Sequence, residues 1–190
     1  MSEFDPMSEL DVYRLLFRYF LENGIQKRVS NSSSSHAIVL ISELIRAAQS
    51  TVDVFCRCLS DAVWGQDEVL SEILKAGQER HVRFRVITQE KIGMNKARKT
   101  FSLVDSELRC LDDKSIAANF MIVDGKSFRF EQDCSNREGF AYARNDELAK
   151  DLNNAFQVLF NKATIVRELG REAAILHGQE NSVAHKESVS

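Results

Sequence analysis

Apolar and polar positions along this chain follow two different periods, and the change between them predicts its elements. From Asp11 to Leu21 apolar residues recur at helical spacing, and Asn23-Gly24 follows as a helix stop. The pattern of HAIVLISELIRAAQS, starting at His36, predicts an amphipathic helix, and TVDVFCRC after it predicts a strand. QDEVLSEILKAG predicts a further helix, with Gly77 just beyond its last turn as the capping glycine.

The second half of the chain is richer in strands. HVRFRVIT alternates apolar and basic residues, as a strand with one buried face does, and SELRCL, AANFMIV, KSFRFE and GFAYAR predict four more strands. Asp124-Gly125 joins the third and fourth of these as a hairpin turn. The helix of NDELAKDLNNAFQVLFNKATIV begins at an Asn145 or Asp146 cap, and its apolar stripe is Leu148, Leu152, Phe156, Leu159 and Phe160. Helices alternating with strands, followed by strands in succession, predict an α/β fold with a mixed sheet flanked by helices.

These elements divide the chain into four parts. We expect an N-terminal helical appendage at residues 1–29, a serine-rich linker or loop at 30–35, an α/β domain with C-terminal helices at 36–178, and a disordered tail at 179–190. The domain is long enough to bury a substantial core.

Composition narrows the class of protein. A hydrophobic content of 44% and a charged content of 28% are typical of a globular protein, and the net charge of -3 gives no whole-chain reason to expect nucleic acid. No apolar run approaches the roughly 20 residues of a membrane span, and the acidic, polar amino terminus lacks the features of a secretory signal. We therefore expect a cytoplasmic protein. The four cysteines, Cys56, Cys58, Cys110 and Cys134, lack zinc-site spacing, so we interpret them as packing residues and expect neither a metal nor a cofactor.

The order of the elements resembles that of the phospholipase D-like family. TVDVFCRCLS, DEVLSEILKAGQER and HVRFRVIT are similar to the front half of such a domain. The family continues with a strand carrying His-x-Lys-x-x-x-x-Asp, usually followed by Gly, then a second strand, a Gly-Ser-x-Asn element and a final helix. Aligning on Asp124-Gly125 places Ala117 in the His slot and Asn119 in the Lys slot. The resemblance covers about residues 36–163 and implies a phospholipase D-like mixed sheet, here with an added N-terminal helix.

The departures from the family motif bear on activity. In the family the His attacks phosphorus and the Lys holds phosphate oxygens, whereas Ala117 is no nucleophile and Asn119 carries no charge. The Gly-Ser-x-Asn slots fall on Glu131, Gln132 and Cys134. None of the four histidines, His36, His81, His177 and His185, has the family's partner spacing. We therefore expect no catalytic residue and no enzyme, and we interpret Asp124 as a turn residue.

A basic segment carries the remaining local charge. Seven basic residues lie between Glu79 and Lys99, against two acidic ones. One interpretation is an anion or nucleic-acid surface near the rim of the cleft. The other, which we favour, is a solvated strand face followed by a basic helix or loop, balanced by acidic neighbours elsewhere. Basic residues alternate along the strand as on an exposed face, and few aromatics interleave with them. The candidates for the first interpretation are Arg83, Arg85, Lys91, Lys96, Arg98 and Lys99.

The first predicted helix is more apolar than a single docking face requires. It should pack on a second chain or on the body of the domain, because leaving so much apolar surface in water is costly. Single-motif members of the resembled family pair across a two-fold axis, which implies a homodimer, and a different protein partner is the alternative. The candidate surface residues are Val12, Leu15, Leu16, Phe17, Tyr19 and Phe20.

Three functions are consistent with these observations. The first is a non-catalytic phospholipase D-like module that acts by binding, as a homodimer or as an accessory subunit of a larger assembly. The second is a divergent phosphodiesterase or nuclease, and the third is a sensor or regulator of nucleic acid or a small ligand. A role in bacterial defence is only an association with the resembled family.

Overall fold

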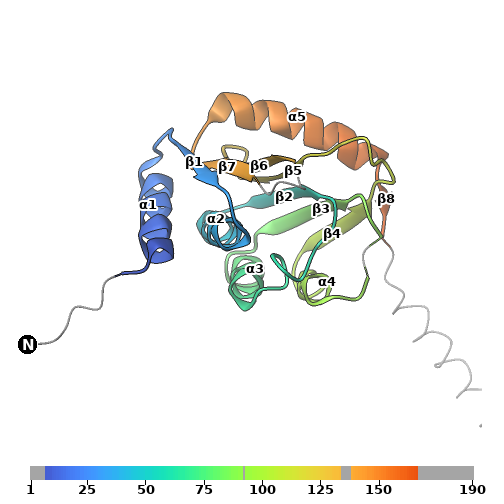
Figure 1. Cartoon of the computed structure of the whole chain (residues 1–190). Helices are drawn as coiled ribbons and strands as arrows, with labels where there is room; N and C mark the ends of the chain where they lie inside the picture. The colour runs from blue at the N-terminus through green and yellow to red at the C-terminus, as the bar shows by residue number, and fades with distance from the viewer. Residues whose placement is uncertain (1–6, 92, 134–137, 167–190) are drawn as a thin grey trace, which may run out of the picture.

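One mixed sheet of eight strands organises the protein (Figure 1). The computed structural model describes residues 7–91, 93–133 and 138–166. Cys134, His177, His185, the end of the expected domain (residues 167–178) and the expected tail at 179–190 lie outside the described residues.

The helices and strands alternate in the first half and strands follow one another in the second. The helices are α1 (Glu9–Asn23), α2 (Ser34–Ala47), α3 (Asp67–Glu79), α4 (Lys96–Phe101) and α5 (Asp146–Lys162). The strands are β1 (Arg28–Asn31), β2 (Thr51–Cys56), β3 (Arg83–Thr88), β4 (Ser106–Cys110), β5 (Asn119–Val123), β6 (Ser127–Asp133), β7 (Glu138–Tyr142) and β8 (Thr164–Ile165).

The sheet changes from parallel to antiparallel beside β2. Its strand order is β1-β7-β6-β5-β2-β3-β4-β8, in which β2, β3 and β4 are parallel and the other pairs are antiparallel. Helices α3 and α4 make the crossovers that parallel strands require. The turn between β5 and β6 has positive φ at both Asp124 (50°) and Gly125 (67°), which the tight hairpin turn demands. The mixed sheet and the Asp124-Gly125 hairpin are confirmed.

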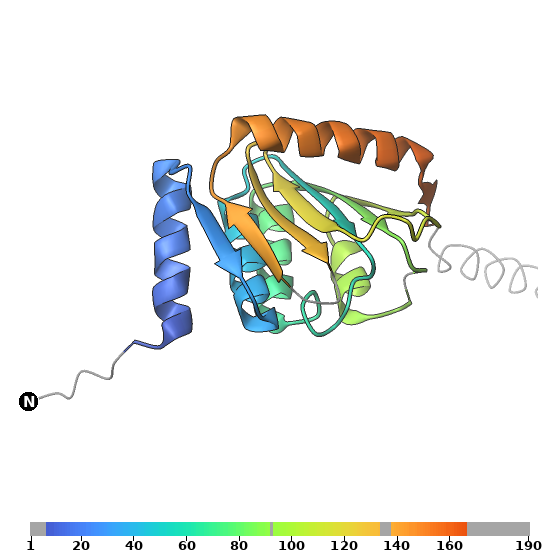
Figure 2. The ribbon, with the colours of Figure 1, turned by 45° about the horizontal axis from the view of Figure 1, so that its top comes forward.

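Helices cover both faces of the sheet and create two separate cores. In Figures 1 and 2, α2, α3 and α4 lie on one face and α5 lies alone on the other. Successive residues of β2 alternate between the two cores, because side chains point to opposite faces along a strand. Val54 packs among the residues of the three-helix core, and Phe55 packs on Phe120 and the α5 core.

Residues 30–35 are not a linker. Strand β1 pairs antiparallel with β7 and buries Val29 and Asn31, so the N-terminal segment continues the sheet. Ser33 caps α2, because its side chain accepts a hydrogen bond from the backbone N–H of His36. The serine run therefore reflects a strand end and a helix cap, two roles in which serine is common.

Of the two glycines predicted to end helices, one does so and one does not. Gly24 ends α1 with φ of 60°, as the Asn23-Gly24 stop predicts. Gly77 lies inside α3, so its prediction as the capping residue is wrong. A Cβ at Gly77 would overlap the side chain of Val104, so close packing is what requires glycine there.

At α5 the predicted start of the helix is confirmed and the predicted end is wrong. Asn145 caps α5 by accepting from the N–H of Leu148, which confirms one of the two predicted caps. The helix ends at Lys162, and Thr164–Ile165 pair with β4 as β8 where the apolar pattern predicted more helix.

A buried carboxylate fastens α1 to α2. Glu43 of α2 is 1% exposed and accepts from Arg18 of α1 (2.8 Å), Arg46 (2.5 Å) and Arg14 (3.3 Å). Burial alone would raise the pKa of Glu43, but the hydrogen bond from Arg18 and the charges of Arg46 and Arg18 outweigh it, so the pKa lies below its usual value. The three guanidinium groups therefore favour the ionised form of this carboxylate.

We expect Glu43→Gln to lower the free energy of unfolding by about 3 kcal/mol at neutral pH, because it leaves three guanidinium groups without their buried counter-charge. The depressed pKa means that this contribution is present above the ordinary Glu pKa of about 4.3 and is lost as the pH falls through the lower pKa of the folded state. Urea denaturation from neutral to acidic pH measures both effects. Lys96→Gln, which breaks the exposed pair with Asp67, is the control and should cost less than about 1 kcal/mol. Equal losses in the two variants would contradict a special role for Glu43.

Candidate functional site

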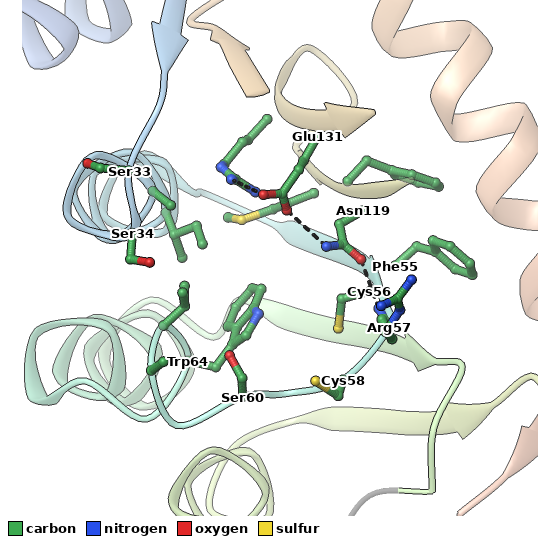
Figure 3. A pocket seen from close by; sticks show the side chains of 17 residues that line it. Ser33, Ser34, Phe55, Cys56, Arg57, Cys58, Ser60, Trp64, Asn119 and Glu131 are labelled. Carbon is green, nitrogen blue, oxygen red and sulfur yellow. Dashed lines mark hydrogen bonds and ion pairs between the residues drawn. The ribbon is translucent and has the colours of Figure 1, made fainter. Parts of the chain in front are cut away.

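A cavity of about 270 Å³ opens at the carboxyl end of β2 (Figure 3). The start of α2, the segment that follows β2, and the strands β5 and β6 surround it. Its apolar wall includes Trp64, Ile41 and Met121. Its polar wall consists of Ser33, Ser34, Arg57, Cys58, Ser60, Asn119, Arg129 and Glu131.

Strand register aligns the floor of this cavity. Asn119 of β5 lies opposite Glu131 of β6, Glu131 opposite Gly139 of β7, and Gly139 opposite Asn31 of β1. Four strands thus place these residues in one row at the end of the sheet. A Cβ at Gly139 would lie 2.8 Å from the Oδ1 atom of Asn31, so the row needs glycine at this place.

The side chains of the floor bind one another. Asn119 Nδ2 donates to Glu131 Oε2 (2.9 Å), and Asn119 Oδ1 accepts from the backbone N–H of Arg57 (2.8 Å). Arg129 lies next to this row, with Nη2 3.5 Å from Glu131 Oε1 and Nε donating to Asn31 Oδ1 (3.1 Å). Figure 3 shows the bonds of Glu131 and Asn119 across the cavity. With Arg129 6% and Glu131 9% exposed, the floor is a satisfied, buried polar network.

The groups available for chemistry in this cavity are weak nucleophiles. Burial, followed by the charge of Glu90, raises the pKa of the Cys58 thiol, so it is neutral at physiological pH. Cys56 is buried at the end of β2. The remaining candidates are the hydroxyls of Ser33, Ser34 and Ser60.

No histidine lines the cavity within the described residues. The ring of His36 lies against that of Tyr13, tilted by 36° with centroids 4.4 Å apart, and the Tyr13 hydroxyl donates to the Ser30 carbonyl. Burial raises the pKa of Tyr13 to about 12. His81, with φ of 56°, precedes β3 and therefore lies at the opposite end of the sheet from the cavity.

The three positions aligned with the family motif are spread along β5. Ala117 lies before the strand, Asn119 begins it at the cavity, and Asp124 follows its other end. Asp124 accepts backbone hydrogen bonds from Gln49 (2.9 Å), Ser50 (2.8 Å) and Thr51 (3.0 Å). Asp124 therefore holds the turn that leads from α2 into β2.

These contacts set the charge of Asp124. Burial would raise the pKa of its carboxyl group. The hydrogen bonds from Thr51, Gln49 and Ser50 together lower the pKa by more than burial raises it, so the pKa lies below its usual value. A carboxylate bound by three amides is a structural acceptor, in agreement with the interpretation of Asp124 as a turn residue.

The six basic candidates do not form one surface. Arg85 lies on the α5 face, where it pairs with Asp53 (2.6 Å) and sits over the rings of Phe156 and Phe160. Arg83 shares that face and lies 3.5 Å from Glu107. The other four lie apart from this pair: Lys96, Arg98 and Lys99 on α4, which covers the opposite face, and Lys91 exposed in the segment before it.

The six apolar candidates of α1 fall into a buried pair and an exposed group of four. Phe17 is 0% exposed and Phe20 7%, and both belong to the core against α2. They are not surface residues, because their direction on the helix is toward the domain. Four remain in solvent with 47–55% exposure: Val12, Leu15, Leu16 and Tyr19.

Several cavity residues escaped sequence reasoning. Arg57, Ser60 and Trp64 follow β2, and a strand end in a mixed sheet is a place where ligands bind, so this signal was present. Arg129 and Ser33 carried no such signal, because strand register and helix packing bring them to the cavity.

Two features are absent from the described residues. No helix among them combines the length and hydropathy needed to cross a membrane. No group of three or more His, Cys, Asp and Glu side chains among them is arranged to hold a metal ion.

We expect Asp124→Asn to lower the free energy of unfolding by about 1–2 kcal/mol at neutral pH, because Asn tolerates the positive φ but lacks the charge that three amides bind. The depressed pKa makes this difference present above the ordinary Asp pKa of about 3.9, and the difference disappears as the pH falls through the folded-state pKa. Chemical denaturation across this pH range measures it. The control is Asp112→Asn at an exposed position, which should change little. A variant as stable as the wild type at neutral pH would show that the carboxylate is dispensable.

Comparison with known proteins shows the fold. No family model and no curated protein sequence matches the chain. The solved structure of TrmBL2, an archaeal chromatin protein with a novel mode of DNA binding, is similar over 82% of this chain with a TM-score of 0.57 and 15% identity, and the chain spans 62% of it.

Two phospholipase D-type structures match over most of their length. Nuc from Salmonella typhimurium, a phospholipase D family member, is 14% identical with a TM-score of 0.55, covering 76% of this chain and 99% of Nuc. NucT from Helicobacter pylori is 10% identical with a TM-score of 0.53, covering 75% of this chain and 100% of NucT. The predicted α/β fold, a phospholipase D-like mixed sheet flanked by helices, is confirmed.

Proposed function

We propose that this phospholipase D-like module performs no phosphodiester chemistry and acts by binding, as a homodimer or as an accessory subunit of a larger assembly. The observation that carries the proposal is the position of Asn119. Where the resembled motif has a lysine, Asn119 is bound on one side by the Arg57 amide and on the other by Glu131. The floor of the cavity is thus closed by its own hydrogen bonds.

Charge at the floor supports the same conclusion. Hydrolysis of a phosphodiester needs an activated nucleophile and cations for the phosphoryl oxygens. Glu131 instead presents a buried carboxylate, whose negative charge opposes a phosphoryl group. Arg129 beside it is engaged by Glu131 and Asn31.

The two alternatives have weaker support. A divergent nuclease rests on the likeness to Nuc and NucT, but the described cavity residues supply no imidazole. Nucleic-acid binding rests on the likeness to TrmBL2, a chromatin protein described as binding DNA. The six basic candidates are divided between two faces of the sheet, so together they do not form one continuous surface.

We expect the purified chain to hydrolyse neither bis(4-nitrophenyl) phosphate nor DNA, single- or double-stranded. The reason is that neither Ala117 nor Asn119 supplies the groups that the reaction needs. Product release is measured in chelator-treated buffer over hours, beside the variants His36→Ala and Cys58→Ala. Turnover that either substitution abolishes would overturn the proposal and favour the divergent phosphodiesterase.

We also expect the full chain to sediment at twice its monomer mass of 21.6 kDa at micromolar concentration, because the resembled family pairs across a two-fold axis. Removal of residues 1–29 is not a usable comparison, since it would strip Phe17, Phe20 and Val29 from the core. The comparison is Leu15→Ser/Leu16→Ser, which alters only exposed side chains of α1 and should leave the dimer intact. A monomer would defeat the homodimer and leave the accessory-subunit form of the proposal.

A further inference from the structure

An apolar stripe runs along the solvent side of α1. Val12, Leu15, Leu16 and Tyr19 follow the spacing i, i+3, i+4 and i+7, which places them on one face of a helix. We call these four residues the α1 seam. Each is 47–55% exposed although α1 buries Phe17 and Phe20 on its other side. Figures 1 and 2 show α1 at the edge of the molecule beside α2.

The helix that carries the seam is firmly held. Ser8 caps its start, Gly24 caps its end, and the Tyr13 hydroxyl ties it to the Ser30 carbonyl of β1. The Glu43 network adds ion pairs to α2. The seam is therefore a preorganised surface, which lowers the entropic cost of docking.

The charges around the seam are acidic. Glu9, Asp11 and Glu22 are exposed at its borders. The two basic residues of the helix face the domain: Arg18 binds Glu43, and Arg14 binds Glu68 through Nη1 (2.5 Å) and Nη2 (2.9 Å). An apolar stripe with acidic borders is thus what α1 offers to a partner.

A second copy of α1 fits this surface badly. Two parallel copies would bring Glu9 next to Glu9 and Glu22 next to Glu22. An antiparallel pair centred between Leu15 and Leu16 would bring Glu9 opposite Glu22. Like charges meet in both arrangements, and an anionic lipid surface would meet the same repulsion.

We propose that the α1 seam docks an amphipathic helix of another protein, whose apolar stripe has the same spacing and whose flanks carry Lys or Arg. Helix-on-helix docking buries the four seam side chains, and the basic flanks complement the three acidic residues. This surface is separate from the cavity, so the inference does not depend on whether the cavity binds a ligand.

The probe is a fluorescent synthetic helix of about 18 residues with leucines at seam spacing and lysines on both flanks. Two further peptides have glutamates in place of the lysines, or the same composition in scrambled order. Fluorescence anisotropy with the full chain should show saturable binding of the lysine peptide alone. Leu15→Ser/Leu16→Ser should weaken this binding at least tenfold. The matched control is Leu103→Ser/Val158→Ser, at residues 63% and 54% exposed elsewhere, and it should leave binding unchanged.

Charge reversal supplies a second measurement that does not alter the seam. Glu9→Lys/Glu22→Lys should weaken binding of the lysine peptide and allow the glutamate peptide to bind. Circular dichroism checks that each variant is folded. Because the charge-reversal variant keeps every apolar residue, the test holds even where the serine variant loses stability.

Four results would overturn the inference. They are failure of the lysine peptide to bind, equal binding of the scrambled peptide, seam-dependent binding to phosphatidylglycerol-containing vesicles, and a dimer in sedimentation that Leu15→Ser/Leu16→Ser dissociates. The last result would assign the seam to a second copy of the chain. Failure here leaves the hydrolysis result untouched, so the two proposals are tested independently.

Discussion

The fastening of β2 at both ends is the constraint on which the site depends. Strand β2 is parallel to β3 on one side and antiparallel to β5 on the other. Asp124, beyond one end of β5, binds three amides that lead into β2, and Asn119, at the other end, binds the amide that leaves it. Because both ends of β2 are fixed, the segment that carries Arg57, Cys58 and Ser60 leaves the sheet in one direction and forms a wall of the cavity.

This fastening gives a structural role to two of the positions aligned with the family motif. Asn119 accepts from the backbone N–H of Arg57, just after β2, and Asp124 accepts from that of Ser50, just before it. A hydrogen bond of this kind contributes about 0.5–1.5 kcal/mol to stability. Ala117 lies before β5. The contacts of Asn119 and Asp124 are thus accounted for by the fold.

Local pattern was sufficient for α2 and α3, for the strands β2 to β7, for the hairpin at Asp124-Gly125 and for the Asn145 cap, because spacing and turn chemistry act within a few residues. It left α4 undecided between a helix and a loop. It failed where a residue far away in the sequence determines the local structure. The side chain of Val104 leaves no room for a Cβ at Gly77, and pairing with β7 places the start of the serine-rich segment in the sheet. Arg85 pairs with Asp53 and packs on an aromatic ring of α5. The floor of the cavity was beyond reach for the same reason: Asn31, Asn119 and Glu131 meet only through the register of four strands.

The position of β1 also has a consequence for how the chain acquires its structure. The strand nearest the amino terminus is the edge strand beyond β7, and Arg28 pairs with Tyr142. During synthesis α1 and β1 leave the ribosome before the other described elements, yet the strand that β1 pairs with is completed only more than a hundred residues later. Non-local pairing of this kind slows folding. Until β7 arrives, Phe17, Phe20 and Val29 lack part of their native surroundings, so the nascent amino-terminal segment is where a chaperone has the most to protect.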